Sequence, residues 1–568
     1  MNLSQAIARM LKAYGADYLF TLTGGPQEPL MEAQLGQGIR VVLGRSERSA
    51  FAMADAYARI TGKPTFGTAQ YGCGTAMLPF ALVDAHWAHS PVVAINSAAD
   101  SRTKFKHEYQ ELEQVPMFGP VTKWAAELPA PDRLADVLRT AIRAAVYGNP
   151  GPAYLSIPSD WYTTELSDSV EIYAEPAFLR VAGLRTAPVA ADIERAARAL
   201  AGAQRPVMVA GGGVLMSEAW DELTALAEAL ALPVVTSISG KGAIAETHPL
   251  AIGVGGRYSR KVANDALDGT DLVLAVGTRL GAMGTDTFKS PRRGTKVVHI
   301  DVDALNLGRS YREEVSICAD AKIALAQLAD AARQAGLPGK PPRWDAWTKK
   351  LQGQLATWRN KCRERAATPM VDGRLNPFTV LAELGGFLDG DEVLVADTGY
   401  MAAWAGTIVE QKKPGRHSLR AAGSLGWAFP AAFGAKLGVG AKRRVLTLIG
   451  DGGMGYHLAD LETALRLKTQ VTTIIMNNAA FGFSYDVQRY LHSQSERLPD
   501  ATDFLDLDFA AIARAFGAHG DTVVEPGELV PALRRAEDSG KPALINVKVS
   551  REVTPPVGRY AAVGGREI

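Results

Sequence analysis

The sequence predicts an α/β protein built from three doubly wound parallel sheets. Short runs of β-branched and aliphatic residues alternate with glycine turns and with amphipathic or alanine-rich helices, and this alternation is typical of parallel strands flanked by helices. The chain has 568 residues, which is long enough for several hydrophobic cores. Passages rich in proline and glycine at 149–161 and 336–344 separate the repeating segments, so we expect boundaries there.

We expect the three domains at 1–175, 185–335 and 355–568. Helices are predicted at 49–62 and 218–231, where apolar or alanine-rich residues recur. Strands are predicted where a β-branched run ends at a turn signal. They lie at 18–22, 41–45, 91–96, within 205–213, and at 233–238, 271–277, 296–303, 392–398, 443–451, 471–477 and 542–549.

Charge and composition exclude several classes of protein. Lys and Arg total 61 against 60 Asp and Glu, so the chain lacks the positive surplus on which nucleic-acid binding depends. No segment approaches the roughly 20 uninterrupted apolar residues of a membrane helix, and the N-terminus does not resemble a secretory signal. Three widely spaced cysteines cannot form a disulfide framework or a four-thiolate zinc site. We therefore expect a cytoplasmic protein with neither nucleic acid nor membrane as partner.

The most informative segment is 443–482. A predicted strand runs into Gly450, Asp451, Gly452 and Gly453, and the next strand ends at an asparagine pair, 477–478. Glycines at a strand's carboxyl end allow backbone N–H groups to approach a phosphate, assisted by the start of the following helix. An aspartate and an asparagine at neighbouring strand ends supply the oxygen ligands that Mg²⁺ prefers. The pattern therefore predicts a phosphate and magnesium site.

Two other interpretations of this segment are open. Residues 450–455 also fit G-x-G-x-x-G, the dinucleotide fingerprint of an oxidoreductase. That fingerprint requires an acidic residue at the end of the second strand, where this chain has Asn477 and Asn478. The second interpretation, a glycine turn that binds no ligand, does not explain why Asp451 and the asparagine pair stand at the strand ends. Both interpretations are therefore disfavoured.

These residues resemble the signature of thiamine diphosphate enzymes. In that signature a Gly-Asp-Gly is followed by an asparagine pair, and here 24 residues separate Gly452 from Asn477. The resemblance implies thiamine diphosphate and Mg²⁺ as cofactors. It also implies that the metal is bound by the side chains of Asp451 and Asn478 and by the main-chain oxygen of Ala480.

The resemblance extends over essentially the whole chain. Residues 44–47 and 50–64 resemble the segment that bears the family's catalytic glutamate, and 205–303 is similar to the central domain of acetolactate synthase and its relatives. Further similarity lies at 72–74, 90–96 and 109–113. This implies a pyrimidine-binding, a central and a diphosphate-binding domain, in that order, of the acetolactate synthase-like branch.

Glu47 is the catalytic glutamate that the resemblance implies. Its carboxyl group would bind the aminopyrimidine ring of the cofactor, and burial would raise its pKa enough for proton exchange. A glutamate between Arg45 and Arg48 also suits a surface salt bridge, which is the alternative.

Other cofactor contacts follow from the same resemblance. Leu425 stands where a bulky side chain supports the bent cofactor, although it also suits a core position. Residues 397–406 resemble the loop that meets the diphosphate, yet Tyr400 and Met401 stand where many relatives carry a polar residue and a histidine. The remaining contacts expected are Gly423, Ser424, Gly450, Gly452, Gly453, Phe481 and Gly482.

The substrate pocket is less readable. Gln110 matches a glutamine that faces the cofactor in relatives, and it either binds a substrate carbonyl or caps a loop. Tyr71 and Cys73 replace the usual serine and proline of a Ser-Gly-Pro-Gly turn, and we interpret Cys73 as a small turn residue rather than a nucleophile. Three histidines are expected to be structural, namely His86, His89 and His457.

The glycines at 211–213 follow a predicted strand of the central domain, where a nucleotide such as FAD could bind. Residues 277–288 do not follow the flavin-binding pattern closely, so FAD is possible but not favoured. The resemblance also implies a homodimer or homotetramer in which Glu47 of one subunit meets Asp451 of another.

The leading hypothesis is acetolactate synthase-like decarboxylation of a small 2-oxo acid with carboligation. The alternatives within the family are a non-ligating 2-oxo acid decarboxylase and a 2-hydroxyacyl-CoA or aldehyde lyase. Outside that chemistry, the alternatives are a dinucleotide oxidoreductase and a non-catalytic protein that retains the fold.

Overall fold

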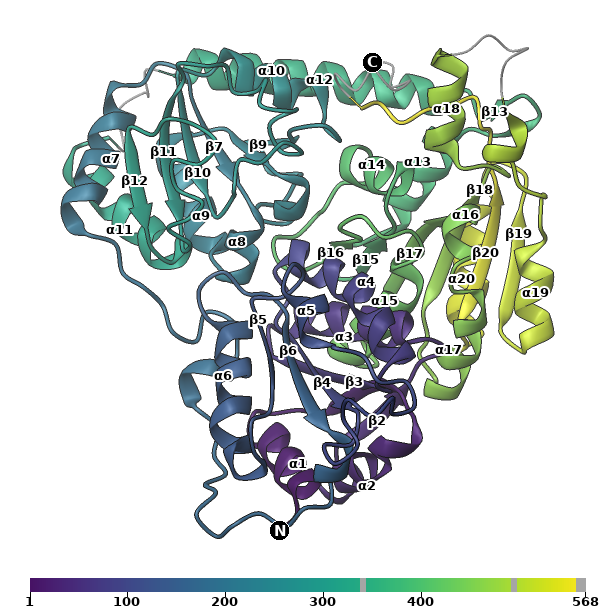
Figure 1. Ribbon diagram of the computed structural model, residues 1–568. Helices are drawn as coiled ribbons and strands as arrows, with labels where there is room; N and C mark the ends of the chain where they lie inside the picture. The colour runs from purple at the N-terminus through teal and green to yellow at the C-terminus, as the bar shows by residue number, and fades with distance from the viewer. Residues whose placement is uncertain (338–343, 492–497, 558–568) are drawn as a thin grey trace. The chain divides into compact units, whose positions relative to one another are not determined.

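The computed structural model describes residues 1–337, 344–491 and 498–557. It contains three six-stranded sheets whose strands are all parallel (Figure 1), which confirms the predicted fold class. Each sheet is built from one of the three predicted domains, whose bounds stay a prediction. The predicted break at 336–344 lies mostly outside the described residues.

The chain folds into two compact units. The first consists of 1–184, 421–443 and 457–471, and the second of 185–420, 444–456 and 472–568. Two segments of the predicted third domain therefore group with the N-terminal sheet. None of the helices in the described part of the chain has the length and hydrophobicity that a membrane crossing requires.

The first sheet has the strand order β2-β1-β3-β4-β6-β5. Its strands are β1 (Tyr18–Leu22), β2 (Arg40–Leu43), β3 (Thr65–Ala69), β4 (Val92–Ala98), β5 (Trp124–Glu127) and β6 (Ala153–Pro158). The helices of this region are α1 (Leu3–Ala13), α2 (Glu28–Gly36), α3 (Glu47–Thr61), α4 (Cys73–Ala88), α5 (Val115–Phe118) and α6 (Leu134–Val146).

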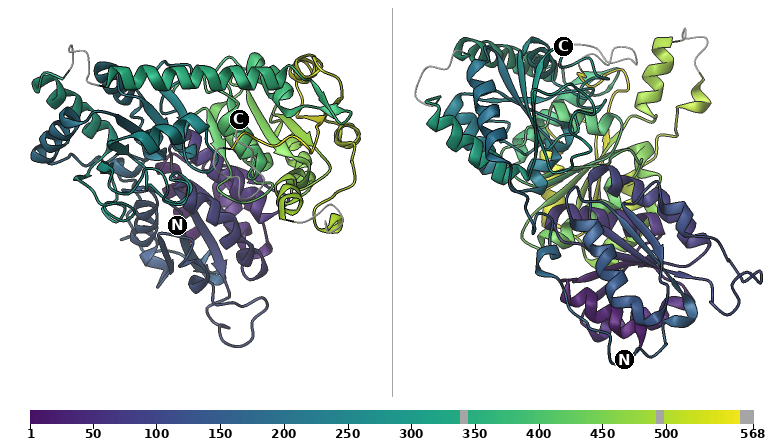
Figure 2. Two further views of the ribbon diagram at one scale, coloured as in Figure 1. Left: turned by 90° about the horizontal axis from the view of Figure 1, so that it is seen from above. Right: turned by 60° about the vertical axis from the view of Figure 1, so that its left-hand side comes forward.

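The second sheet has the order β12-β11-β10-β7-β8-β9, that of a dinucleotide-binding fold. Crossovers between parallel strands are generally right-handed, so strands added on both sides of the first strand place helices on both faces of the sheet. The turned views show helices on either side of this sheet (Figure 2). The strands are β7 (Pro206–Ala210), β8 (Val234–Thr236), β9 (Ala251–Val254), β10 (Leu272–Val276), β11 (Lys296–Asp301) and β12 (Val315–Cys318). The helices are α7 (Ala190–Gly202), α8 (Gly212–Met216), α9 (Trp220–Leu230), α10 (Lys261–Gly269) and α11 (Ala321–Gln334).

The third sheet has the order β16-β15-β17-β18-β20-β19. A long helix, α12 (Asp345–Ala366), and a short hairpin of β13 (Met370–Val371) and β14 (Arg374–Leu375) precede it. Its strands are β15 (Val393–Ala396), β16 (Ser418–Arg420), β17 (Val445–Gly450), β18 (Thr472–Asn477), β19 (His519–Val523) and β20 (Ala543–Lys548). The helices are α13 (Pro377–Phe387), α14 (Tyr400–Thr407), α15 (Ala428–Val439), α16 (Asp451–Met454), α17 (Leu461–Leu467), α18 (Gly482–Leu491), α19 (Phe509–Phe516) and α20 (Leu529–Asp538).

The passage at 149–161 is not only a boundary, contrary to the prediction. It contains β6, whose six residues are all buried between β4 and β5. Pro158 is the last residue of β6, a position where the missing N–H disrupts little of the ladder. Eight other strands were also not predicted, namely β3, β5, β9, β12, β13, β14, β16 and β19.

Strand order determines where ligands can bind. In each sheet the chain leaves its first strand in one direction and later returns to add strands on the other side. Ligands of doubly wound sheets bind beyond the carboxyl ends of the strands at this reversal. The reversals lie between β1 and β3, between β7 and β10, and between β15 and β17.

Candidate functional site

In the second unit, the predicted metal-binding residues Asp451 and Asn478 follow the carboxyl ends of two neighbouring strands, β17 and β18. β17 pairs in parallel with β15 on one side and with β18 on the other. In the register with β18, Gly450 lies opposite Met476. Asp451 and Asn478 therefore leave the same edge of the sheet, as the sequence predicted.

Asp451 is a buried carboxylate without a partner. Only 7% of the residue is exposed, and neither carboxylate oxygen accepts a hydrogen bond from a described residue. Burial raises the pKa of Asp451 to about 6, and the nearby backbone N–H groups of Asn478 and Gly452 offset only part of this shift because they do not reach hydrogen-bonding geometry. A buried charge without compensation is costly. The site is therefore suited to a cation.

Asn477 and Asn478 have different surroundings. Asn477 is fully buried, and its side-chain amide donates to Asn546 Oδ1 at 3.1 Å, which ties β18 to β20. Asn478 is half-buried, and its Oδ1 accepts the N–H of Ala480 at 3.1 Å. Asn477 thus holds the strand end, while Asn478 and Ala480 form the turn that leaves the sheet.

Two glycines near the turn after β17, Gly452 and Gly482, lie so close to other residues that a side chain would not fit. A Cβ atom at Gly452 would lie 2.6 Å from the Phe481 ring, and one at Gly482 would lie 3.0 Å from Asn478 Nδ2 and 3.1 Å from Tyr400. At Gly450 a Cβ would meet nothing within 4 Å. The loop after β17 therefore packs tightly on one side and is open at Gly450, as a phosphate-binding loop requires.

Glu47 lies at the other candidate site, in the first unit. It is the first residue of α3, directly after Ser46, whose side chain caps the helix by accepting the Ser49 N–H at 3.1 Å. Burial raises the pKa of the half-buried Glu47 carboxyl. Among the described residues Glu47 has no salt bridge, since the partner of Arg45 is Glu462. The salt-bridge alternative is therefore disfavoured.

Close packing also shapes the surroundings of Glu47. A Cβ at Gly74 would lie 2.9 Å from Glu47 Oε1 and 3.2 Å from Gln70 Cβ. A Cβ at Gly72 would lie 2.5 Å from the Gln110 Cβ. The glycine turn after β3 thus brings Glu47, Gln70 and Gln110 into one region of the unit.

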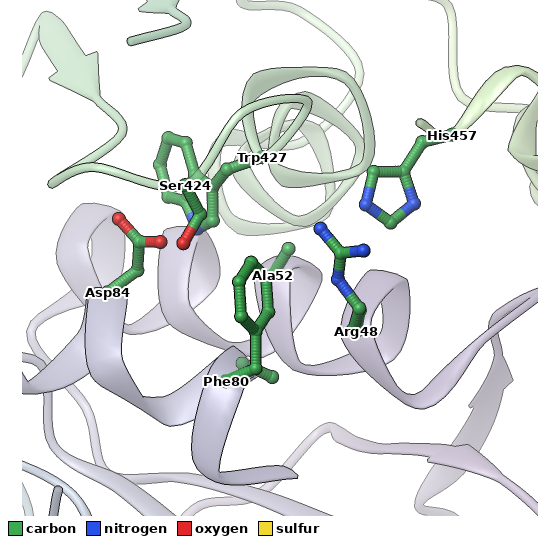
Figure 3. A pocket seen from close by; sticks show the side chains of 8 residues that line it. Arg48, Ala52, Phe80, Asp84, Ser424, Trp427 and His457 are labelled. Carbon is green, nitrogen blue, oxygen red and sulfur yellow. The ribbon is translucent and has the colours of Figure 1, made fainter. Parts of the chain in front are cut away.

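The segment with Gly423, Ser424 and Leu425 is held by side chains of the first unit (Figure 3). Asp84 of α4 accepts the N–H groups of Ala422 at 2.5 Å and Gly423 at 3.1 Å. The indole N–H of Trp427 donates to Asp55 of α3 at 3.0 Å.

Ser424 and Leu425 are only half-buried, so Leu425 does not belong to a core. Beside Ser424 lies a cavity of about 10 Å³ lined by Arg48, Ala52, Phe80, Ala81, Asp84, Ser424, Trp427 and His457.

Family models match the chain in three consecutive segments. Residues 1–117 match the N-terminal TPP binding domain of thiamine pyrophosphate enzymes, 193–328 match the central domain, and 397–547 match the C-terminal TPP binding domain.

Curated relatives align over nearly the full length. The chain is 30% identical to a sulfoacetaldehyde acetyltransferase of Castellaniella defragrans, with 99% of this chain and 95% of the relative covered. It is 29% identical to a probable acetolactate synthase large subunit of Methanocaldococcus jannaschii, with the same coverage. It is also 29% identical to an acetolactate synthase of Mycobacterium bovis, with 94% of this chain and 85% of the relative covered.

The chain belongs to the thiamine pyrophosphate enzyme family. It is an enzyme that uses thiamine diphosphate, as the sequence predicted. The unpaired Asp451 carboxylate and the open position at Gly450 fit the cation and diphosphate of that cofactor.

Tyr400 and Met401 stand where many relatives carry a polar residue and a histidine. Tyr400 donates its hydroxyl to Asp486 of α18 and packs edge-on against Phe483, with ring centroids 5.8 Å apart. Met401 is buried in the hydrophobic core of the third sheet. The start of α14 is thus fixed by packing and by one hydrogen bond.

The central glycines of the enzyme pack on a neighbouring loop. A Cβ at Gly211 would lie 2.5 Å from Thr278 Cβ, and one at Gly213 would lie 2.7 Å from Gly277 Cα. These two glycines are needed for contact between the turns after β7 and β10. Their presence therefore does not require a nucleotide, and FAD stays a possibility that is not favoured.

Sequence reasoning missed Gln70, Asp55 and Asp84. Asp55 is fully buried, and besides Trp427 it accepts hydrogen bonds from Arg59 at 2.8 Å and Ser90 at 2.5 Å. The spacing of Asp55 and Arg59, one helical turn apart, was a signal in the sequence. Gln70 had no such signal, because strand β3, which it follows, was itself not predicted.

The variant Asp451→Asn tests whether this carboxylate is kept for a cation. In the folded wild type the pKa of the Asp451 carboxyl is about 6, above the value of about 3.9 for an aspartate in an unfolded chain. The metal-free folded protein therefore loses stability as the pH rises from about 4 through 6, by roughly 3 kcal/mol at pH 7. We expect the metal-free variant to be more stable than metal-free wild type at pH 7.5, with little difference near pH 4, in urea unfolding.

Added Mg²⁺ and thiamine diphosphate should reverse that order, because only the wild type gains a carboxylate ligand. Asp330→Asn is the matched control, since Asp330 forms an exposed pair with Arg333 and should show neither effect. A metal-free Asp451→Asn protein that is less stable than wild type at pH 7.5 would contradict this assignment.

Proposed function

We propose that the protein uses thiamine diphosphate and Mg²⁺ to decarboxylate a 2-oxo acid and to join the remaining fragment to a second carbonyl compound. The observation that carries this proposal is the buried, unpaired Asp451 carboxylate at the strand reversal of the third sheet, beside Asn478. The full-length similarity to acetolactate synthases supports the same reaction class.

Asp451, Asn478 and the carbonyl of Ala480 would hold Mg²⁺. All three offer oxygen atoms, and Mg²⁺ usually completes its coordination with substrate or cofactor phosphates and water. Consistent with this, the described residues contain no group of three or more His, Cys, Asp or Glu side chains that would hold a metal alone. The cation is thus expected to bind together with the diphosphate.

Glu47 would move a proton at the pyrimidine ring. Thiamine diphosphate supplies an electron sink for the bond that breaks next to a carbonyl. Burial raises the pKa of the Glu47 carboxyl, so it can hold a proton nearer neutral pH and return it. Its position at the start of α3, with room left by Gly74, fixes the carboxyl in one place.

The remaining predicted contacts would position the cofactor and the substrate. Asp84 fixes the backbone of Gly423, so Ser424 and Leu425 can support the cofactor from a loop whose shape is set by hydrogen bonds. Gln110 has a positive φ of 58°, which is uncommon for a residue other than glycine and often marks a functional position. We assign its amide to the substrate carbonyl.

A second candidate is acetyl transfer from sulfoacetaldehyde, the reaction named for the 30% identical relative. Tyr71 and Cys73 replace the usual serine and proline in the turn beside Glu47. A changed turn at this place would suit a substrate other than that of acetolactate synthase. Decarboxylation without ligation and a lyase reaction use the same cofactor-binding residues. The chemistry of the second substrate separates these candidates.

We further propose that the active unit is at least a homodimer with shared sites. Glu47 lies in the first unit and Asp451 in the second. The helix after the glycine turn, α4, exposes Met77, Phe80 and Trp87, which are 41%, 47% and 54% exposed. Large apolar side chains that one helix leaves exposed suit contact with a second protein surface.

Reconstitution with a substrate screen tests the function. Protein stripped with EDTA should regain turnover only when Mg²⁺ and thiamine diphosphate are both added. We expect CO₂ and a ligated product from pyruvate, while sulfoacetaldehyde, benzoylformate, oxalyl-CoA and simple aldehydes test the alternatives. Tight NAD binding combined with no binding of thiamine diphosphate would overturn the proposal.

Mixing two inactive variants tests the shared site. Glu47→Gln and Asp451→Asn each damage a different half of it. If the halves come from different subunits, a mixed dimer has one intact site and one doubly damaged site. Random exchange then gives about a quarter of the wild-type activity. Each variant mixed with itself is the control, and no recovery after verified subunit exchange would contradict sharing.

A further inference from the structure

Gln70 occupies the position in the first sheet where a ligand is expected. It directly follows β3, next to the turn that leaves β1, and these two strands flank the reversal of chain direction. A Cβ at Gly24, which follows β1, would lie 2.7 Å from the Gln70 amide carbon. The amide of Gln70 thus extends across the ends of both strands, where doubly wound sheets bind ligands.

The base of the Gln70 side chain lies near Glu47. A single Cβ atom at Gly74 would meet both Glu47 Oε1 at 2.9 Å and Gln70 Cβ at 3.2 Å. Replacing Gly74 by a larger residue would therefore disturb both side chains. This shared neighbour places the Gln70 side chain beside the Glu47 carboxyl.

The hydrogen bonds of Gln70 are incomplete. Its Oε1 is buried and accepts no hydrogen bond from the described residues. Its Nε2 is 3.5 Å from Gln110 Oε1, beyond the 2.7–3.2 Å usual for such a bond. Buried polar groups normally have partners. The Gln70 side chain therefore has unused donor and acceptor capacity.

A neighbouring glutamine shows the contrast. Gln27 is fully buried near the same strands, and its Nε2 donates to Thr68 Oγ1 at 2.7 Å and also to the carbonyl of Ala69. Its Oε1, like that of Gln70, accepts no hydrogen bond from the described residues, so the two side chains differ at the amide nitrogen, which in Gln27 is satisfied within the fold. Gln70 has only the long contact with Gln110.

We propose that Gln70 donates its Nε2–H, now held only by the long contact with Gln110, to a carbonyl oxygen of the substrate and, together with Gln110, determines which carbonyl compound is accepted. The inference rests on the proposed function, because it assigns a substrate contact to that site. A neutral amide suits this position, since it provides a directional donor beside Glu47 without a charge. A charged neighbour would shift the pKa on which Glu47 depends.

The test compares Gln70→Leu with wild type in two assays. The first is kcat/KM for the probe that supports turnover, pyruvate or sulfoacetaldehyde. The second is hydrogen–deuterium exchange at C2 of bound thiamine diphosphate without substrate. We expect kcat/KM to fall about tenfold or more, the effect of losing one hydrogen bond to a reacting group, while exchange stays at the wild-type rate. Glu47→Gln is the positive control that loses exchange.

Gln334→Ala is the matched control, because Gln334 is exposed at the end of α11; both assays should match wild type. If Gln70→Leu does not fold, Gln70→Asn replaces it and should lose part of kcat/KM. Unchanged kcat/KM in an active, folded variant would overturn the inference, and so would loss of C2 exchange. Wild type inactive on both probes would instead overturn the proposed function, before any variant is compared.

Discussion

The cost of burying the Asp451 carboxylate is the constraint on which the functional site depends. Its oxygens are shielded from water, and no described residue donates a hydrogen bond to them. A protein retains such a group only if something else compensates the charge. A cation that also binds phosphate oxygens would provide this compensation.

All three sheets contain a reversal of chain direction, but different residues lie beside it in each sheet. In the third sheet the reversal between β15 and β17 lies beside an unpaired carboxylate, and in the first sheet the reversal between β1 and β3 lies beside the amide of Gln70. In the second sheet the reversal is filled by contact between Gly213 and Gly277. Chemistry is therefore expected at two reversals, while the glycines of the middle one are explained by contact between two turns.

Much of this arrangement could be predicted from the sequence, because parallel strands bring their carboxyl ends together. That rule alone predicts that Gly450, Asp451 and Asn478 lie at the same edge of the third sheet. Strand β6 was missed because prolines at 152 and 158 border its apolar run and suggest a break. Gln70 and Asp84 were missed because their importance depends on contacts with Gly24 and Gly423, which are distant in the chain and have no local signal.

The central claim is that one chain combines Asp451 and Asn478 into a cation site for the diphosphate of its cofactor. A crystal structure of the protein with thiamine diphosphate and with Mn²⁺ in place of Mg²⁺ tests it most directly. Diffraction data collected near the manganese absorption edge would locate the metal by its anomalous signal. The account predicts a single manganese peak between the diphosphate and the side chains of Asp451 and Asn478, and no peak there in Asp451→Asn. Manganese bound elsewhere, or a diphosphate held without contact to Asp451, would contradict it.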